Sequence, residues 1–235
     1  TARLVRVAAS AAMAPAGTVT SVFTDDAERQ GAYDFLESKH VDPDALERGV
    51  GETLARRCAT EERILVPVDG SSLSFVDRTG ERGLGAVGTY EAGAVGLKVI
   101  SALALTTDGV PLGLLRQVFW RRPVQRPTNR RPAKKRPIDK KETRHWLDAV
   151  NTSAERIGAV PGAPRITFLV DREGDSAAML CTLVATKHDF IVRGNWDRTV
   201  RAADGRSWKV RTLMGYEKQL GSYDVELAGG PGRAA

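Results

Sequence analysis

Two aspartates in this sequence each follow a short run of apolar, mostly β-branched residues. Asp69 follows ILVPV and Asp171 follows ITFLV. Polar side chains at strand ends project from rigid backbone, so both carboxylates are candidates for chemistry. Two adjacent carboxylates repel each other unless a divalent cation neutralises them, and hard Mg²⁺ (or Mn²⁺) suits such a pair together with water and phosphate. The pair therefore predicts metal-assisted cleavage of a phosphodiester.

Both aspartates also have a plainer interpretation, which the sequence leaves open. An aspartate that follows a strand is often a turn residue, and Asp69 in D-G-S-S fits that role well. The interpretation is weaker for Asp171, because D-R-E-G-D places several charged residues directly after one apolar strand. Within that group we expect Asp175 to cap the next helix. The segment 83–88 matches G-x-G-x-x-G, but no buried strand precedes it, so a dinucleotide site is not expected.

Positive charge is concentrated in one segment. Residues 116–145 hold 12 of the 35 Lys and Arg residues and 2 of the 29 Asp and Glu residues, a local charge of +10 in a chain of net +6. Such a segment suits a polyphosphate such as nucleic acid, because each neutralised phosphate releases counterions. The alternative is a solvated loop whose charges only prevent collapse. Four prolines between 123 and 137 forbid a continuous helix there.

The order of expected elements indicates how the aspartates are positioned. Residues 1–60 read as helices, with Asp25 and Asp42 as caps and Pro43 at a first helical position. From Ile64 onward we expect three strands, the last two joined by a turn at Asp108-Gly109, and then a helix, the strand ITFLV, a helix and the strand DFIVRGN. Short strands are expected around WKVRTLM and SYDVELA. This order predicts an α/β (α+β mixed sheet) protein with a ribonuclease-H-like core, whose first and fourth strands are neighbours.

Several segments together resemble one family. VPVDGSSLSFVDRTGERGLGAVGTY is similar to the first-aspartate motif of insertion-sequence-four family cut-and-paste DDE transposases, and FLVDREGDSAAML is similar to their second-aspartate motif. DFIVRGNWDR resembles the strand that follows, and RLVRVAASAA and GAYDFLES resemble their N-terminal helical domain. The resemblance implies a helical transposon-end-binding domain over 1–60 and a ribonuclease-H-like core over 61–235, truncated in its β-rich insertion.

The resemblance also implies an activity. Asp69 and Asp171 would be catalytic, metal-binding members of a DDE triad that uses Mg²⁺ (or Mn²⁺) to cut double-stranded DNA at transposon ends and join it to target DNA. A homodimer on DNA is implied. The expected DNA-binding residues are all basic: Arg193, Arg198, Arg121, Arg122, Arg130, Arg131, Lys134 and Lys135. No apolar run is long enough for a membrane span, so a cytoplasmic, nucleoid-associated protein without a membrane partner is expected.

Two departures from the family pattern limit this expectation. Gly70 stands where the family usually has Thr, which would loosen the backbone beside Asp69. The third carboxylate belongs to a Y-x-x-R-x-x-x-E-x-x-x-x-x-x-K box, to which the segment beginning at Tyr216 is a poor match, with Gln219 in place of Arg and Tyr223 in place of Glu. We therefore expect a fragment that lacks the catalytic Glu and is inactive alone. The alternatives are a non-catalytic DNA-binding fragment that inhibits transposition, or a decaying remnant.

Overall fold

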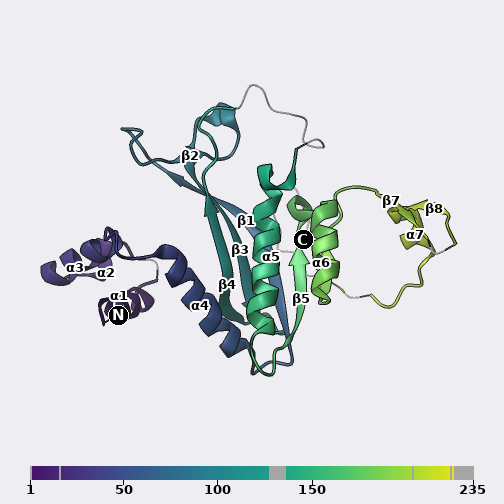
Figure 1. Ribbon diagram of the computed structural model, residues 1–235, viewed down its shortest axis with the longest axis horizontal. Coiled ribbons are helices and arrows are strands. Elements are labelled where there is room, and N and C mark those ends of the chain that lie inside the picture. Colours follow the sequence, from purple (N-terminus) through teal and green to yellow (C-terminus); the bar gives the residue numbers. More distant parts are fainter. Residues whose placement is uncertain (1, 16, 127–135, 203, 223, 225–235) are drawn as a thin grey trace.

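A mixed six-stranded sheet forms the centre of the computed structural model, which describes residues 2–15, 17–126, 136–202, 204–222 and 224 (Figure 1). The sheet has the order β2-β3-β1-β5-β6, with β4 also paired to β3. Its strands are β1 (Arg63–Phe75), β2 (Gly85–Ala86), β3 (Val95–Leu105), β4 (Pro111–Trp120), β5 (Arg165–Val170) and β6 (Asp189–Val192). The strands β1, β5 and β6 run parallel, whereas β3 is antiparallel to its neighbours. The predicted mixed α/β sheet is confirmed, as is the prediction that the first strand lies beside ITFLV.

Two of the helices in the described residues begin directly after the capping residues that the sequence predicts. The α-helices are α1 (Ala2–Met13), α2 (Val19–Val22), α3 (Asp26–Leu36), α4 (Pro43–Cys58), α5 (Thr143–Gly158), α6 (Ala177–Thr186) and α7 (Val210–Tyr216). The predicted caps are confirmed: Asp25 accepts a hydrogen bond from the backbone N–H of Glu28, and Asp42 accepts one from that of Asp44, with Pro43 in the first turn. These side chains satisfy backbone donors that a helix start would otherwise leave unpaired.

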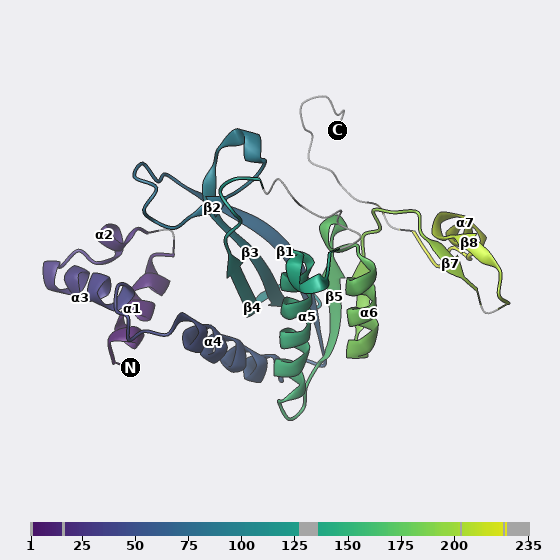
Figure 2. The same ribbon diagram turned by 45° about the horizontal axis from the view of Figure 1, so that its top comes forward.

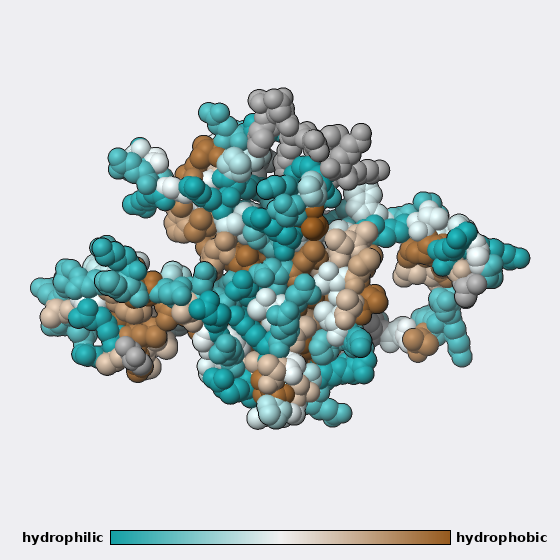
Figure 3. Space-filling view, in the orientation of Figure 1, coloured by the Kyte–Doolittle hydropathy of each residue, from teal (hydrophilic) through white to brown (hydrophobic). Residues whose placement is uncertain are grey.

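The apolar core lies on one face of the sheet. Alternate residues of β1 and β5 are buried, namely Ile64, Val66, Val68, Ile166, Phe168 and Val170. They form one cluster with buried residues of α4, α5 and α6. Because side chains alternate between the faces of a strand, these three helices must cover the same face. Figure 2 shows all three on one side of the strands, and hydrophilic residues cover most of the outer surface of α4 and α5 in Figure 3.

The helix α4 packs as part of the sheet core, although it precedes the first strand. Its residues Leu54, Ala55 and Cys58 belong to the buried cluster. Its Glu47 also pairs with Arg116 of β4 at 2.6 Å and with Arg156 of α5 at 2.8 Å. The helix α4, which belongs to the predicted 1–60 helical region, is therefore in contact with the sheet. The helices α1, α2 and α3 form a group of their own beside α4 (Figure 1).

The last described part of the chain differs from the sequence-based expectation. The segment WKVRTLM, which was expected to be a strand, divides into β8 (Ser207–Lys209), paired with β7 (Thr199–Arg201), and the helix α7. The strand prediction is therefore wrong from Val210 onward. The segment SYDVELA lies mostly outside the described residues. No helix in the described part of the chain is long and apolar enough to cross a membrane.

Candidate active site at the carboxyl edge of the sheet

Asp69 and Asp171 lie next to each other in the register of two parallel strands. The last residue pair between β1 and β5 is Val68 with Val170, so each aspartate stands one residue beyond it. Neighbouring strands are separated by about 5 Å, which places the two backbones side by side at this edge. The strand β5 ends here as predicted. The strand β1 does not: Asp69 pairs with Ser101 of β3 and β1 continues to Phe75. Asp69 is therefore neither a strand-end residue nor a turn residue.

Each carboxylate is oriented by one backbone N–H. The N–H of Gly70 donates to Asp69 Oδ1 at 2.7 Å, and the N–H of Glu173 donates to Asp171 Oδ1 at 2.8 Å. Asp69 is exposed and Asp171 is half-buried. Within the described ranges neither aspartate takes part in an ion pair, so two like charges share one edge. This arrangement leaves the second oxygen of each carboxylate available to a ligand that approaches from solvent.

Trp146 of α5 packs against the residues that follow both aspartates. A Cβ atom at Gly174 would lie 2.2 Å from Val170 Cγ1 and 3.2 Å from the Trp146 ring, and a Cβ atom at Gly70 would lie 3.3 Å from that ring. The two glycines thus leave room for the indole. The expectation that Gly70 loosens β1 is not met, because Gly70 keeps a regular pairing with Ile100 of β3.

The carboxylate of Glu173 connects this edge with the end of β4. Glu173 lies in the short 3₁₀ helix η4 (Arg172–Gly174), and its Oε2 is 3.7 Å from the position that a Cβ atom of Gly70 would take. The pKa of Arg122 is raised, first by its hydrogen bonds to Glu142 and further by the negative charge of Glu173. Sequence reasoning did not single out Glu173, because nothing in D-R-E shows which way a 3₁₀ turn directs the third residue.

Arg193 occupies the third position along the same edge. The last residue pair between β5 and β6 is Val170 with Val192, and the N–H of Arg193 donates to the carbonyl of Val170 at 2.8 Å. Asp69, Asp171 and Arg193 therefore each stand one residue beyond the last parallel pairing of β1, β5 and β6. The side chain of Arg193 is exposed to solvent. Its placement suits a contact with an anion that binds beside the aspartates.

Arg198, the other predicted contact on this side, is bound within the protein. Its guanidinium donates to Asp175 Oδ1 at 2.6 Å and to the Asp175 carbonyl at 2.9 Å. The side chain of Asp175 is 3% exposed and also accepts the N–H groups of Asn195 and Trp196. Burial alone would raise the pKa of this carboxyl, but these hydrogen bonds lower it overall. Asp175 does not cap α6 as predicted; the cap is Ser176, which accepts the N–H of Met179.

The predicted basic segment is described in part. Arg121 donates to the Gly83 carbonyl at 3.1 Å, and Arg122 forms a two-pronged pair with Glu142 at 2.5 and 2.6 Å. The other four predicted contacts lie outside the described residues, namely Arg130, Arg131, Lys134 and Lys135. Arg121 and Arg122 line a cavity between the end of β4 and the start of α5. Sequence reasoning identified the charge of this segment but not the cavity.

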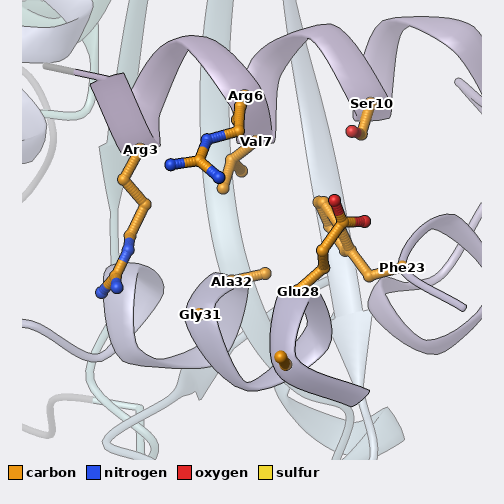
Figure 4. A pocket seen from close by; sticks show the side chains of 9 residues that line it. Arg3, Arg6, Val7, Ser10, Phe23, Glu28, Gly31 and Ala32 are labelled. Carbon is orange, nitrogen blue, oxygen red and sulfur yellow. The ribbon is translucent and has the colours of Figure 1, made fainter. Parts of the chain in front are cut away.

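A second cavity lies between α1 and α3, away from the aspartates. Its volume is about 210 Å³, and in Figure 4 Arg3 and Arg6 extend from one helix while Glu28 extends from the other. Phe23 and Ala32 are buried at its base. Opposite charges at the rim and apolar residues at the base are typical of the contact between two packed helices. This cavity is therefore not part of the candidate site.

No family model matches this sequence. Among the described residues there is also no group of three or more His, Cys, Asp or Glu side chains arranged to hold a metal ion. The candidate site thus rests on two carboxylates and their neighbours.

Proposed function

We propose that this chain is part of a DNA transposase of the insertion-sequence-four family, with a ribonuclease-H-like core in which Asp69 and Asp171 bind Mg²⁺ (or Mn²⁺) for cleavage and joining of DNA strands. One observation carries the proposal. The register of β1 and β5 ends at Val68 and Val170, so two aspartates from motifs 102 residues apart in the sequence become neighbours. Asp171 also caps the short 3₁₀ helix η4 through one of its oxygens, which leaves the other oxygen for a ligand.

The donor set suits Mg²⁺. Magnesium prefers oxygen ligands, is commonly held by only one or two carboxylates, and keeps several water molecules or substrate oxygens. Asp69 and Asp171 supply two carboxylates at a solvent-accessible edge, each with one oxygen already fixed by a backbone N–H. When bound, the ion would supply positive charge to the phosphate and a more acidic water. The aspartates would hold it, and Arg193 would balance charge on the phosphate beside them.

The remaining parts of the proposal concern DNA. Arg122, in the described part of the basic segment, lies close enough to Glu173 that, after the hydrogen bonds to Glu142, the negative charge of Glu173 also raises the pKa of Arg122, which supports a place for this residue near the aspartates. We infer that the basic segment 116–145 contacts the backbone of double-stranded DNA, that α1, α2 and α3 contribute to recognition of the transposon end, and that two copies of the chain act together on paired ends.

The first test compares Asp69→Asn with Asp108→Asn. Asp69 belongs to the proposed site, whereas Asp108 is an exposed aspartate in the turn between β3 and β4. Mg²⁺ binding is measured by titration calorimetry, and nicking of supercoiled plasmid is measured with Mg²⁺ or Mn²⁺. We expect Asp69→Asn to lose measurable Mg²⁺ binding and any nicking, because one of two ligands is gone. Asp108→Asn should match the wild type. Equal Mg²⁺ affinity in both variants would contradict the proposed site.

A second candidate function is DNA binding without cleavage. The observation that favours it is that no third metal-binding side chain joins the pair in the described part of the chain. Under this alternative the wild-type chain binds DNA and Mg²⁺ yet leaves plasmid intact, and Asp69→Asn changes only the affinity for Mg²⁺. Metal-dependent nicking by the wild-type chain, lost in Asp69→Asn, would exclude it.

A further inference from the structure

A strongly basic cavity lies between the end of β4 and the start of α5. Its volume is about 410 Å³. The residues that line it are Tyr90, Trp120, Arg121, Arg122, Pro123, Arg136, Asp139, Lys140, Lys141, Glu142, Arg144 and His145. Six of these are Arg or Lys and two are acidic. Both acids already face a cation, since Arg122 binds Glu142 and Lys140 Nζ is 3.7 Å from Asp139. The remaining charge on the wall is positive.

Two residues of this wall carry buried donors. Trp120 Nε1 and Arg136 Nε have no hydrogen-bond partner among the described residues. Because these two atoms are themselves shielded from solvent, a ligand in the cavity would meet the charged ends of the wall and not these donors. The first turn of α5 also belongs to the wall and contains no acidic residue. Its helix dipole therefore adds partial positive charge to the cavity.

One side of the cavity is aromatic. The rings of Trp120 and His145 stack with their centroids 4.2 Å apart and their planes inclined by 16°. Burial, and next the adjacent Arg144, lower the pKa of His145 below its usual value, which disfavours the charged form of the ring. The side chain of Arg144 donates to His145 Nε2 at 3.3 Å, which fixes the ring. The wall thus combines a flat aromatic surface with separate cations, as sites for nucleic-acid strands do.

We propose that this cavity binds a backbone phosphate of a DNA strand, together with its sugar or base, and seats that strand beside the Asp69–Asp171 edge. The inference rests on the proposed function, because it supplies the substrate position for the same site. A volume of about 410 Å³ is in the range of roughly 300–1,000 Å³ that holds a whole small molecule, so a nucleotide unit fits it better than a phosphate alone. His145 directly precedes Trp146, whose ring packs against Gly70, so the cavity and the aspartates share one rigid support.

The test measures DNA affinity without any metal ion. A short fluorescein-labelled DNA duplex is titrated by anisotropy in EDTA over a series of salt concentrations. The test variant is Lys141→Gln/Arg144→Gln, and the matched control is Arg48→Gln/Lys187→Gln, which removes two exposed cations from other elements. If both cations neutralise phosphate, the slope of log K against log salt falls by about 0.9 per contact, which is about eightfold in affinity near 0.1 M salt. The control should retain the wild-type slope.

A single variant covers the case in which the double variant unfolds. Lys141→Gln removes one cation of the wall and leaves the other lining residues in place. We expect the slope of log K against log salt to fall by about 0.9, because one phosphate contact is lost. A wild-type slope in this variant, or in a folded double variant, would overturn the proposal. Inorganic phosphate that displaces the duplex at concentrations equal to those of DNA phosphate would overturn the assignment to a strand.

The test of the cavity and the test of the metal site can fail independently of each other. Asp69→Asn should retain the wild-type salt slope in EDTA, because it leaves the basic cavity intact. A cavity variant that binds normally, combined with loss of Mg²⁺ binding in Asp69→Asn, would refute only the cavity. The reverse pair of results would refute only the metal site.

Discussion

The two ends of the parallel strands β1, β5 and β6 carry charged residues in opposite arrangements. At the amino end, Arg63 and Arg165 both pair with Asp189, with Arg165 at 2.7 Å from the carboxylate. At the carboxyl end, Asp69 and Asp171 are neighbours, and within the described ranges no cation pairs with either of them. The same three strands therefore hold an ion-pair cluster of two arginines and one aspartate, net charge +1, at one edge and two aspartates without an ion-pair partner among the described residues at the other.

This difference separates a structural edge from a candidate functional edge. At the amino end the hydrogen bonds from Arg165 and Arg63 lower the pKa of Asp189 to about 2, so the folded state favours its charged form. At the carboxyl end a comparable benefit requires a cation from outside the chain. Functional sites commonly leave charged groups without a partner in the protein, because a ligand supplies the partner.

The largest effect on stability is expected from Asp175→Asn. This change lies beside the candidate functional edge and removes a carboxylate that pairs with Arg198. Arg198 would lose its carboxylate partner in a mostly buried position, and we expect a loss of about 3 kcal/mol in the free energy of unfolding. Urea denaturation measures it. Asp204→Asn removes an exposed aspartate that is 3.6 Å from Arg206, and it should change stability by less than about 0.5 kcal/mol. Equal effects of the two changes would show that Asp175 has no special structural role.

A smaller, pH-dependent effect is expected from Asp189→Asn at the amino edge. A carboxyl whose pKa is lowered on folding stabilises the protein above its unfolded pKa, 3.8, and this contribution is lost as pH falls toward about 2. The variant should therefore melt at a lower temperature than the wild type at pH 7. The difference between their melting temperatures should shrink between about pH 4 and pH 2. A difference that is constant with pH would mean that the ion pairs do not stabilise this edge.

The smallest effect on the free protein is expected from Asp171→Asn. Removing one of two like charges at an accessible edge should leave stability unchanged or raise it by at most about 1 kcal/mol in EDTA. Addition of Mg²⁺ should raise the melting temperature of the wild type and not that of the variant, because only the wild type retains both ligands. Destabilisation in EDTA similar to that of Asp189→Asn would remove the contrast between the two edges.

The sequence was sufficient to predict the central part of the fold. Apolar runs before Asp69 and Asp171 and the amphipathic segment around Trp146 indicated the strands and helix in the right order, and this order predicted that β1 and β5 are neighbours. Pairing length was not predictable, because the continuation of β1 beyond Asp69 depends on β3 and not on local residues. The packing of α4 on the sheet also depends on distant partners, such as Arg116 for Glu47.

The candidate site was predictable only in its charged residues. Asp69, Asp171 and Arg193 each follow an apolar run of residues, and that pattern is visible in the sequence. The ion pair of Asp175 could not be predicted from the sequence. Its partner Arg198 is 23 residues away, and the pair forms only when the chain after β6 folds back. The cavity at Trp120 was missed for a similar reason, since its wall joins the end of β4 to the first turn of α5.

The unequal lengths of β1 and β5 also affect how the protein resists self-association. Beyond Val68, β1 pairs with β3 on one side, and no described strand occupies its other side as far as Phe75. Such an open edge is a template on which a strand of another molecule can add, and Leu73 and Phe75 are 39% and 46% exposed. Lys98, bound to Ser72 at 2.9 Å, places a charge of the kind that discourages this addition. The early end of β5, which exposes the two aspartates, therefore also makes protection against aggregation necessary along the same strand.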